Sequence, residues 1–192
     1  MRQDTYDANL VSTIIKALEN SDQYHTDILH QRSVAGEANL FSNYGTLPKG
    51  DFFWGYIDMP AGLNNGITAL HPTVQSTTPV VLRGYFNPTI DETGWTNVSV
   101  PNLRSDSTSG FKGDMYTGND TDNAASISDK GTLFYESLVG TGKHDGGMVT
   151  SNIVGVVSPG DSMLMEVENI DASDAELSIN LPLTELTDEN NI

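Results

Sequence analysis

The stretch SPGDSMLMEVENIDASDAELSINLP, residues 158–182, is the most regular part of the chain. Apolar residues occupy every second position on both sides of a short polar connection, residues 169–174. One face carries Met163, Met165 and Val167, and the other run carries Ala175, Leu177, Ile179 and Leu181. A period of two predicts β-strands with one face in a core and one in water. We expect the runs to pair as a hairpin, with Glu166, Glu168 and Glu176 on the wet faces.

Segments of the same kind recur along the chain from residue 38 onward. Turn-forming residues separate them at roughly 8–12 residue spacings, which is typical of a sandwich or barrel. The predicted strands are residues 38–41, 52–59, 67–70, 79–86, 95–100, 132–139 and 148–157, followed by the two runs of the opening stretch. Residues 52–59 are apolar on both faces, so we expect them to be covered on both sides. The predicted fold class is all-β, a single jelly roll or β-sandwich of about eight strands with an N-terminal α-helix.

The first segment of the chain has a different period. Leu10, Ile14 and Leu18 fall four residues apart, which predicts an amphipathic helix. The predicted organisation is an N-terminal helical arm (1–32), a jelly-roll domain (33–186) with a polar insertion (101–131), and an acidic tail (187–192). The arm either packs on its own domain or docks on a neighbouring copy, and both interpretations stay open.

Residues 101–131 form a long segment that is rich in Gly, Asp and Ser. A loop of this length inside a compact domain usually has a function or is disordered when alone. Neither this insertion nor the N-terminal helix has an obvious place inside one sandwich, and subunit interfaces are where such elements pack. The candidate interface residues are Leu10, Ile14, Leu18, Phe111 and Tyr116.

The charge of the chain excludes several classes of partner. Its 192 residues include 26 acidic and 9 basic side chains, which gives a formal net charge of −17. Such a charge repels phosphate backbones and anionic membrane surfaces, so we expect no nucleic acid and no direct membrane insertion. Self-repulsion also destabilises the compact state unless salt screens it, and at molar salt the Debye length is only about 3 Å. We interpret the composition as adaptation to a saline habitat; the alternative is an ordinary acidic protein.

Targeting and redox signals are absent from the sequence. No stretch approaches the ~18 apolar residues that span a bilayer. The N-terminus MRQDTYDANL carries acidic residues where a secretory signal carries basic ones, so we expect no export by that route. The chain contains no Cys, which excludes a disulfide scaffold, a thiolate nucleophile and a Cys-bearing zinc site.

No motif in the sequence specifies a reaction. The residues from Gly160 to Met163 resemble the G-D-S-L block of an esterase family, but no His follows them to act as the base. A turn ahead of a strand accounts for this block, and an esterase that uses Ser162 is the weaker hypothesis. The Gly-rich stretch 140–144 lacks two defining residues of a phosphate-binding loop. We expect no catalytic residue and no cofactor.

Metal-binding patterns are equally weak. The histidines, His25, His30, His71 and His144, do not have the spacing of a metal centre. Asp120 and Asp122 gather oxygen ligands without the full pattern of a calcium loop, so they are a weak candidate cation loop. A solvated acidic loop is the alternative interpretation.

The order of parts supports a resemblance to a known family. A helix, about eight short strands, a long polar insertion and the closing stretch S-P-G-D-S-M-L-M-E-V-E-N…A-E-L-S-I-N-L-P follow one another in an acidic, cysteine-free chain. In size, pattern and composition this resembles the smaller single-jelly-roll major capsid proteins of membrane-containing icosahedral viruses that infect halophilic archaea. The resemblance implies a capsid subunit, made in the host cytoplasm and located in the virion. It also implies assembly with its own copies and a paralogous subunit into capsomers above an internal membrane.

A binding module is the main alternative function. A virion decoration protein, or a receptor- or carbohydrate-binding jelly roll, would expose aromatic side chains such as Trp54 and Tyr56 as a stacking platform. The two apolar faces of residues 52–59 favour a place in the core instead. Exposure or burial of Trp54 and Trp95 discriminates between these hypotheses.

Overall fold

A computed structural model describes residues 35, 37–64, 66–69, 72–104, 106, 111–140, 147–150 and 155–185. Antiparallel strands make up most of these residues, and helix is confined to short segments, so the all-β prediction is confirmed. The predicted arm 1–32 and tail 187–192 lie outside the described residues, and Leu10, Ile14 and Leu18 lie outside them too.

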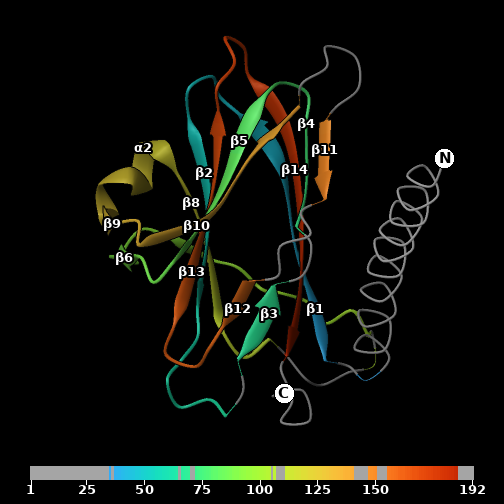
Figure 1. Cartoon of the computed structure of the whole chain (residues 1–192), viewed down its shortest axis with the longest axis vertical. Coiled ribbons are helices and arrows are strands. Elements are labelled where there is room, and N and C mark those ends of the chain that lie inside the picture. Colours follow the sequence, from blue (N-terminus) through green and yellow to red (C-terminus); the bar gives the residue numbers. More distant parts are fainter. Residues whose placement is uncertain are drawn as a thin grey trace, which may run out of the picture.

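Two six-stranded sheets face each other and form a β-sandwich (Figure 1). In the first, sheet A, the long strand β14 pairs with β1 along one edge. Along its other edge it pairs with β4 and then with β3. Strand β4 pairs in turn with β11, and β3 pairs with β12. The strands of sheet A are β1 (Ala38–Leu47), β3 (Ile67–Ala69), β4 (Thr73–Ser76), β11 (Gly147–Thr150), β12 (Gly155–Val157) and β14 (Ala175–Glu185).

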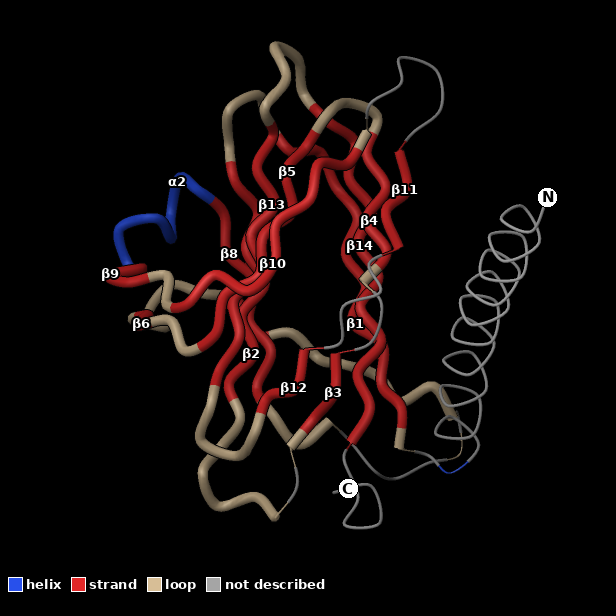
Figure 2. The backbone as a smooth tube through the Cα atoms, viewed as in Figure 1, coloured by secondary structure: helices blue, strands red, loops and turns tan. Residues whose placement is uncertain are grey.

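The second sheet, sheet B, has the strand order β10-β5-β13-β2-β8-β7. Its strands are β2 (Phe52–Asp58), β5 (Val80–Phe86), β7 (Thr96–Asn97), β8 (Asp114–Asn119), β10 (Thr132–Val139) and β13 (Ser162–Asn169). A cap of smaller elements lies beside its outer face: the pair β6 (Thr89–Ile90) and β9 (Ile127–Asp129), the helix α2 (Asp120–Asn123) and the 3₁₀ turn η1 (Ala124–Ser126). Figure 2 shows α2, β6 and β9 on the side of sheet B that faces away from sheet A.

A proline lies in β14 between its pairing with β4 and its pairing with β3. Asn180 pairs with Thr73, whereas Leu183 pairs with Ala69, so the two registers differ by one residue. Pro182 lies between these pairs and has no N–H to donate. Opposite it, Leu40 directs its N–H away from β14 to the carbonyl of Pro101 at 3.0 Å. Pro182 therefore directs its nitrogen to the other edge of β14, at the point between its pairing with β4 and its pairing with β3.

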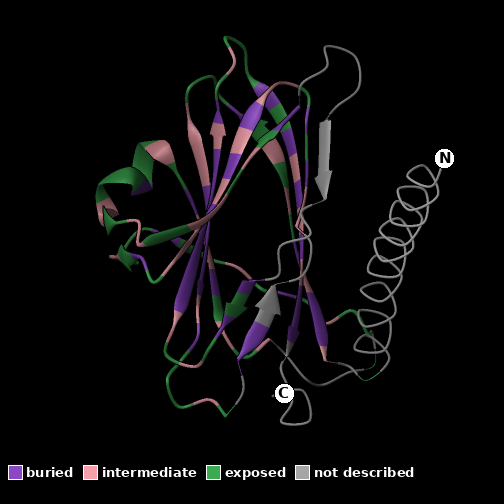
Figure 3. Cartoon of the chain, in the orientation of Figure 1, coloured by how far each residue is buried: buried purple, intermediate pink, exposed green. Residues whose placement is uncertain are grey.

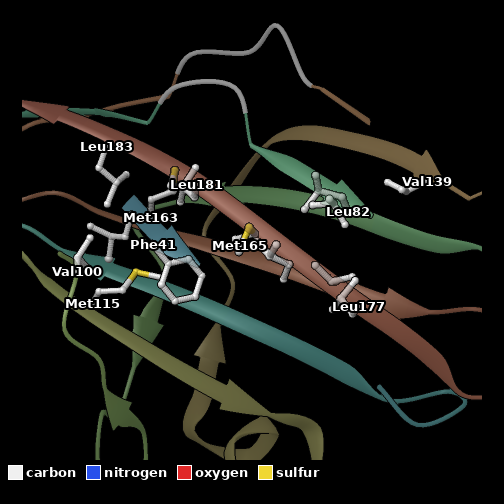
Figure 4. Close-up of a cluster of buried hydrophobic side chains, with 14 of the residues drawn as sticks. Phe41, Leu82, Val100, Met115, Val139, Met163, Met165, Leu177, Leu181 and Leu183 are labelled. Carbon is white, nitrogen blue, oxygen red and sulfur yellow. The ribbon is translucent and has the colours of Figure 1, made fainter. Parts of the chain in front are cut away.

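The core lies between the sheets and takes side chains from both (Figure 3). Figure 4 shows Met163 and Met165 of sheet B pointing toward Phe41, Leu177 and Leu181 of sheet A. The strands with the strictest alternation, β13 and β14, supply the centre of each layer because each pairs on both edges. Full burial of one such aliphatic side chain contributes about 1.5–3 kcal/mol, so these central strands carry much of the hydrophobic stabilisation.

The predicted hairpin of residues 158–182 is wrong, although both of its strands exist. β13 pairs with β2 and β5 in sheet B, and β14 pairs with β1, β3 and β4 in sheet A. The connection between them crosses from one sheet to the other. Alternation identifies the apolar face of a strand but not the strand that pairs along its edge. The apolar faces of β13 and β14 meet across the core, and the two strands do not lie side by side in one sheet.

The crossing connection is held by one buried amide. The Nδ2 of Asn169 donates to the carbonyl oxygens of Leu47, Pro48 and Ser173 at 3.0–3.1 Å. Its backbone N–H also donates to the carbonyl of Asp51 at 3.0 Å. Asn169 thereby joins the β1–β2 turn to the β13–β14 connection and satisfies carbonyls that would otherwise be unpaired.

Other strand predictions need smaller corrections. Strand β1 runs to Leu47, beyond the predicted 38–41, and β4 was not predicted at all. Of the predicted strand 95–100, only Thr96–Asn97 is a strand. Residues 114–129 are not part of a long loop, because they form β8, α2, η1 and β9. Asn119 caps α2, and Asp120 and Asp122 lie in its first turn, so polar residues that a composition argument assigns to a loop begin a helix instead.

Candidate functional site

The outer face of sheet B carries three aligned rows of side chains across its strands. In the middle row, Arg83 lies between Glu136 of β10 and Glu166 of β13, and Trp54 of β2 lies beyond Glu166. Another row places Leu133 of β10, Tyr85, Leu164 and Tyr56 next to one another. Alternation in β2, β5 and β13 directs all of these side chains away from the main core.

The prediction that Glu166 faces water is wrong, because this residue is fully buried at 0% exposure. The Nη1 of Arg83 donates to Glu166 Oε1 at 2.8 Å, and the Nζ of Lys130 binds Oε2. The Trp54 Nε1 donates to Oε2 at 3.4 Å. The alternation of the sequence correctly places Glu166 on the face of β13 opposite the main core. The cap covers this outer face of sheet B, and alternation alone does not show whether another layer covers a face.

The electrostatics of this buried cluster favour the ionised carboxylate. Burial of Glu166 opposes ionisation, but the hydrogen bonds from Lys130 and Arg83 outweigh it and hold the pKa of Glu166 below its ordinary value. Arg83 also binds Glu136 at 2.5 Å and Glu168 at 2.6 Å, and these carboxylates raise the pKa of its guanidinium despite partial burial. Each of the three carboxylates, the guanidinium and the ammonium thus makes at least one charge-assisted hydrogen bond within the cluster.

Aromatic side chains surround the cluster and complete the interior of the cap. Trp95 stacks on Trp54 with a ring-centroid distance of 6.1 Å, and its Nε1 donates to Ser126 Oγ at 2.7 Å. Tyr56 packs edge-on against Trp95 at 6.1 Å and lies 5.9 Å from Tyr116. Burial raises the pKa of Tyr56 to about 12. This second core explains why β2 is apolar on both faces, as predicted.

The tryptophans do not form an exposed platform. Trp54 is 2% exposed and Trp95 is 8% exposed. Stacking on a sugar requires an accessible ring face, which neither indole offers. The second core therefore has a structural role in holding the cap on sheet B.

The weak candidate cation residues serve a helix terminus. Asn119 caps α2, because its Oδ1 accepts a hydrogen bond from the N–H of Asp122 at 3.1 Å. Asp120 and Asp122 lie in the first turn of the helix, where a carboxylate interacts favourably with the helix dipole. Among the described residues, no three His, Asp or Glu side chains gather in a way that could hold a metal ion.

The remaining sequence candidates lie in structural positions. Phe111 packs against the main core, and Tyr116, on β8, packs against the second core; whether either contacts another subunit is not tested by the fold of one chain. Ser162 begins β13, is buried, and donates its N–H to Asn87 Oδ1 at 3.0 Å. The four histidines and residues 141–146 lie outside the described part of the chain.

Arg83 and Lys130 are the important residues that our sequence interpretation missed. Arg83 is the only basic residue between Lys49 and Arg104, and it interrupts an otherwise apolar strand. A single cation on the outward face of a strand, in a chain this acidic, was a usable signal for a buried carboxylate partner. Lys130 gave no such signal, because it follows a polar segment.

A cleft opens on the opposite side of β2 from this cluster. Its volume is about 380 Å³, and it lies between the edge strand β1 and the junction of β8 with α2. Its walls include Asn43, Asp51, Phe53, Asn119, Thr121 and Asp122. Among the described residues that line it, none is a Lys or Arg. Asn43, Asp51 and Thr121 use no side-chain hydrogen bond within the described part of the fold.

Comparisons with known proteins add no identity to these features. No protein-family model matches the chain, and no curated protein matches it either. Within the described residues, no helix combines the length and the hydropathy needed to cross a membrane.

Proposed function

We propose that this chain is a jelly-roll subunit of a virion shell. The strand order carries the proposal. If β6 to β9 are set aside as an insertion, and β3 with β4, and β11 with β12, are each counted as one interrupted strand, sheet A has the order first, eighth, third, sixth. The matching part of sheet B has the order fifth, fourth, seventh, second. This order matches the double Greek key of an eight-stranded jelly roll, a fold of viral capsid and lectin domains and of cupins, and so supports the proposal.

Fold alone does not define function, so the surface has to discriminate among these classes. The binding alternative would use the tryptophans as an exposed stacking platform, whereas Trp54 and Trp95 are buried. A shell subunit needs broad lateral surfaces and no catalytic site. In the described part of the chain, the polar cluster around Glu166 makes its hydrogen bonds to other residues of the same fold. These observations favour the shell role over the binding module.

The charge of the chain sets the conditions for assembly. Copies with a formal net charge of −17 repel one another at low ionic strength. Salt, bound cations or a complementary subunit must offset that repulsion before lateral contacts form. We therefore propose that the partners are further copies and a paralogous shell subunit.

The test is the assembly state in high salt. The chain should be expressed alone and together with a second acidic jelly-roll subunit, and its mass measured by sedimentation velocity with particle shape from electron microscopy. We expect ring-like oligomers or mixed capsomers in molar salt and dissociation as the salt is removed. A stable monomer at high protein concentration in molar salt, even with the second subunit present, contradicts the proposal.

A further inference from the structure

The sheet edges of this fold differ in how well they are protected against pairing with another chain. Edge strand β10 has a bulge between Leu133 and Tyr135, and β7 has two residues. Strands β11 and β12 have four and three. Bulges and short strands are the usual means by which proteins block edge pairing. Strand β1, by contrast, has ten residues and a continuous register with β14.

Half of the β1 edge is already occupied by the chain itself. The N–H of Leu40 donates to the carbonyl of Pro101 at 3.0 Å, and the carbonyl of Ala38 accepts from the N–H of Leu103 at 2.8 Å. Backbone groups of an antiparallel strand alternate in direction, so Ser42, Tyr44 and Thr46 also direct their N–H and C=O groups outward. No described residue pairs with these three backbone positions. The open window, residues 42–46, contains no Lys, Pro or bulge.

The cleft of about 380 Å³ lies along the inner side of this window. One wall of the cleft is formed by Asn43 and Gly45, which alternate along β1 with the outward-directed backbone positions 42, 44 and 46. Asp51 and Asp122 lie on its other walls. A strand added to β1 would place every second side chain over this cleft, because side chains alternate between the two faces of a sheet. The cleft's carboxylates, with no Lys or Arg among its described lining residues, are complementary to a cationic side chain.

We propose that the free half of β1 is a strand-addition site for an extended polypeptide segment with a Lys or Arg at the positions that face the cleft. Main-chain hydrogen bonds to Ser42, Tyr44 and Thr46 supply affinity, and the cleft supplies selectivity for the cation. Two copies of the window would bring acidic clefts together, so the charge favours a different polypeptide over a second copy. This site goes beyond the proposed shell role and does not depend on it.

The first test is a selection from a random peptide library against the full chain, followed by affinity measurements on the selected peptides. We expect Lys or Arg at every second position among β-forming residues. Tyr44→Pro removes one outward N–H and keeps the backbone bonds to β14; like Tyr44→Ser, it loses the side-chain bond from Tyr44 to Glu176. We expect about tenfold weaker binding, as for the loss of one hydrogen bond. Tyr44→Ser retains the backbone donor and should bind the peptides as the unchanged chain does.

The cleft is tested with a matched pair of charge variants. Asp51→Asn combined with Asp122→Asn should weaken the selected peptides about tenfold at low salt, with the difference shrinking as salt is added. Glu92→Gln removes an exposed charge outside the cleft and should have no effect. Peptides without Lys or Arg enrichment, or binding unaffected by the double variant, would overturn the assignment of a cationic partner.

Hydrogen exchange keeps the proposal testable even if Tyr44→Pro does not fold. In the unchanged chain, the amides of Ser42, Tyr44 and Thr46 should exchange fast alone and slowly with a selected peptide bound, while those of Asn43 and Gly45 stay protected by β14. Peptide binding without this alternating protection would overturn strand addition. Binding of neutral oligosaccharides in the cleft, with exchange at 42–46 unchanged, would assign the cleft to a glycan instead.

Discussion

Glu166 is a carboxylate whose charge is balanced from outside its own strand. Arg83 comes from β5, Trp54 from β2, and Lys130 from the segment that leads into β10. A buried charge is tolerated only when its partners remain in place, because removing one leaves an uncompensated ion in a poorly solvated site. The cluster therefore links the cap to sheet B as well as neutralising the carboxylate.

Replacing Arg83 with Met should destabilise the fold strongly. The variant leaves Glu166 buried beside Glu168, with only Lys130 to balance it, and breaking a buried pair typically costs about 3–5 kcal/mol. Chemical unfolding in molar salt measures the loss of unfolding free energy. As a matched control, Arg104→Met removes the exposed pair with Asp106 and should cost far less than Arg83→Met, because water screens an exposed ion pair. Equal losses in the two variants would contradict a special role for the Glu166 cluster.

The same residue predicts a pH dependence. The folded-state pKa of Glu166 lies below its ordinary value of 4.5, so its ionised form stabilises the fold above that pH. This stabilisation is lost as the pH falls from 4.5 through the folded-state pKa. We expect the unfolding free energy of the unchanged chain to fall more steeply over this range than that of Glu166→Gln. The check is denaturant unfolding from neutral pH downward, and parallel curves for the two proteins would refute it.

At the scale of elements, the cap is a separate layer on sheet B. It is assembled from β6, β9, α2 and η1, and Trp95 joins it to β2 through its stacking on Trp54 and its hydrogen bond to Ser126. Gly131, with a φ of +80°, lies between Lys130 and β10 and turns the chain from the cap back into the sheet. Trp95 is therefore one of the side chains that hold the cap on sheet B.

Trp95→Ala should loosen the cap and destabilise the fold by about 3–5 kcal/mol, the usual cost of truncating a buried Trp. The readouts are denaturant unfolding and the emission of Trp54, the second tryptophan of the chain, which should shift to the red as water reaches it. Leu133→Ala, a half-exposed change on β10, is the control and should leave the Trp54 emission unchanged. An unchanged Trp54 spectrum in Trp95→Ala would show that the cap is held by other contacts.

What the sequence predicts well at this scale is which face of a strand is apolar. The alternation of Met163, Met165 and Val167, and the two apolar faces of residues 52–59, are both confirmed. Pairing was not predictable, because the edge partners of β13 and β14 come from distant segments whose hydrogen bonds leave no trace in composition. The Glu166 cluster was missed for the same reason, since its cations lie 36 and 83 residues away along the chain.

At the scale of the whole molecule, charge dominates the expected behaviour. A formal net charge of −17 is screened over about 10 Å at 0.1 M salt and about 3 Å at 1 M. We expect the unfolding free energy to rise with NaCl over this range and then level off. The check is urea unfolding at several NaCl concentrations, with glycerol as an uncharged control. A stability that stays constant or falls as NaCl rises would contradict the interpretation of the acidic surface as salt-adapted.

The central positions of β13 and β14 constrain how the molecule is made. Sheet B has β13 between β5 and β2, and sheet A has β14 between β1 and the β3–β4 pair. Neither sheet can form completely until residues beyond 161 have left the ribosome. Strand β13, which joins the two halves of sheet B, and strand β14, which joins those of sheet A, both lie in this part of the chain. The earlier strands emerge with unpaired edges, so neither sheet can consolidate until residues 162–185 have left the ribosome.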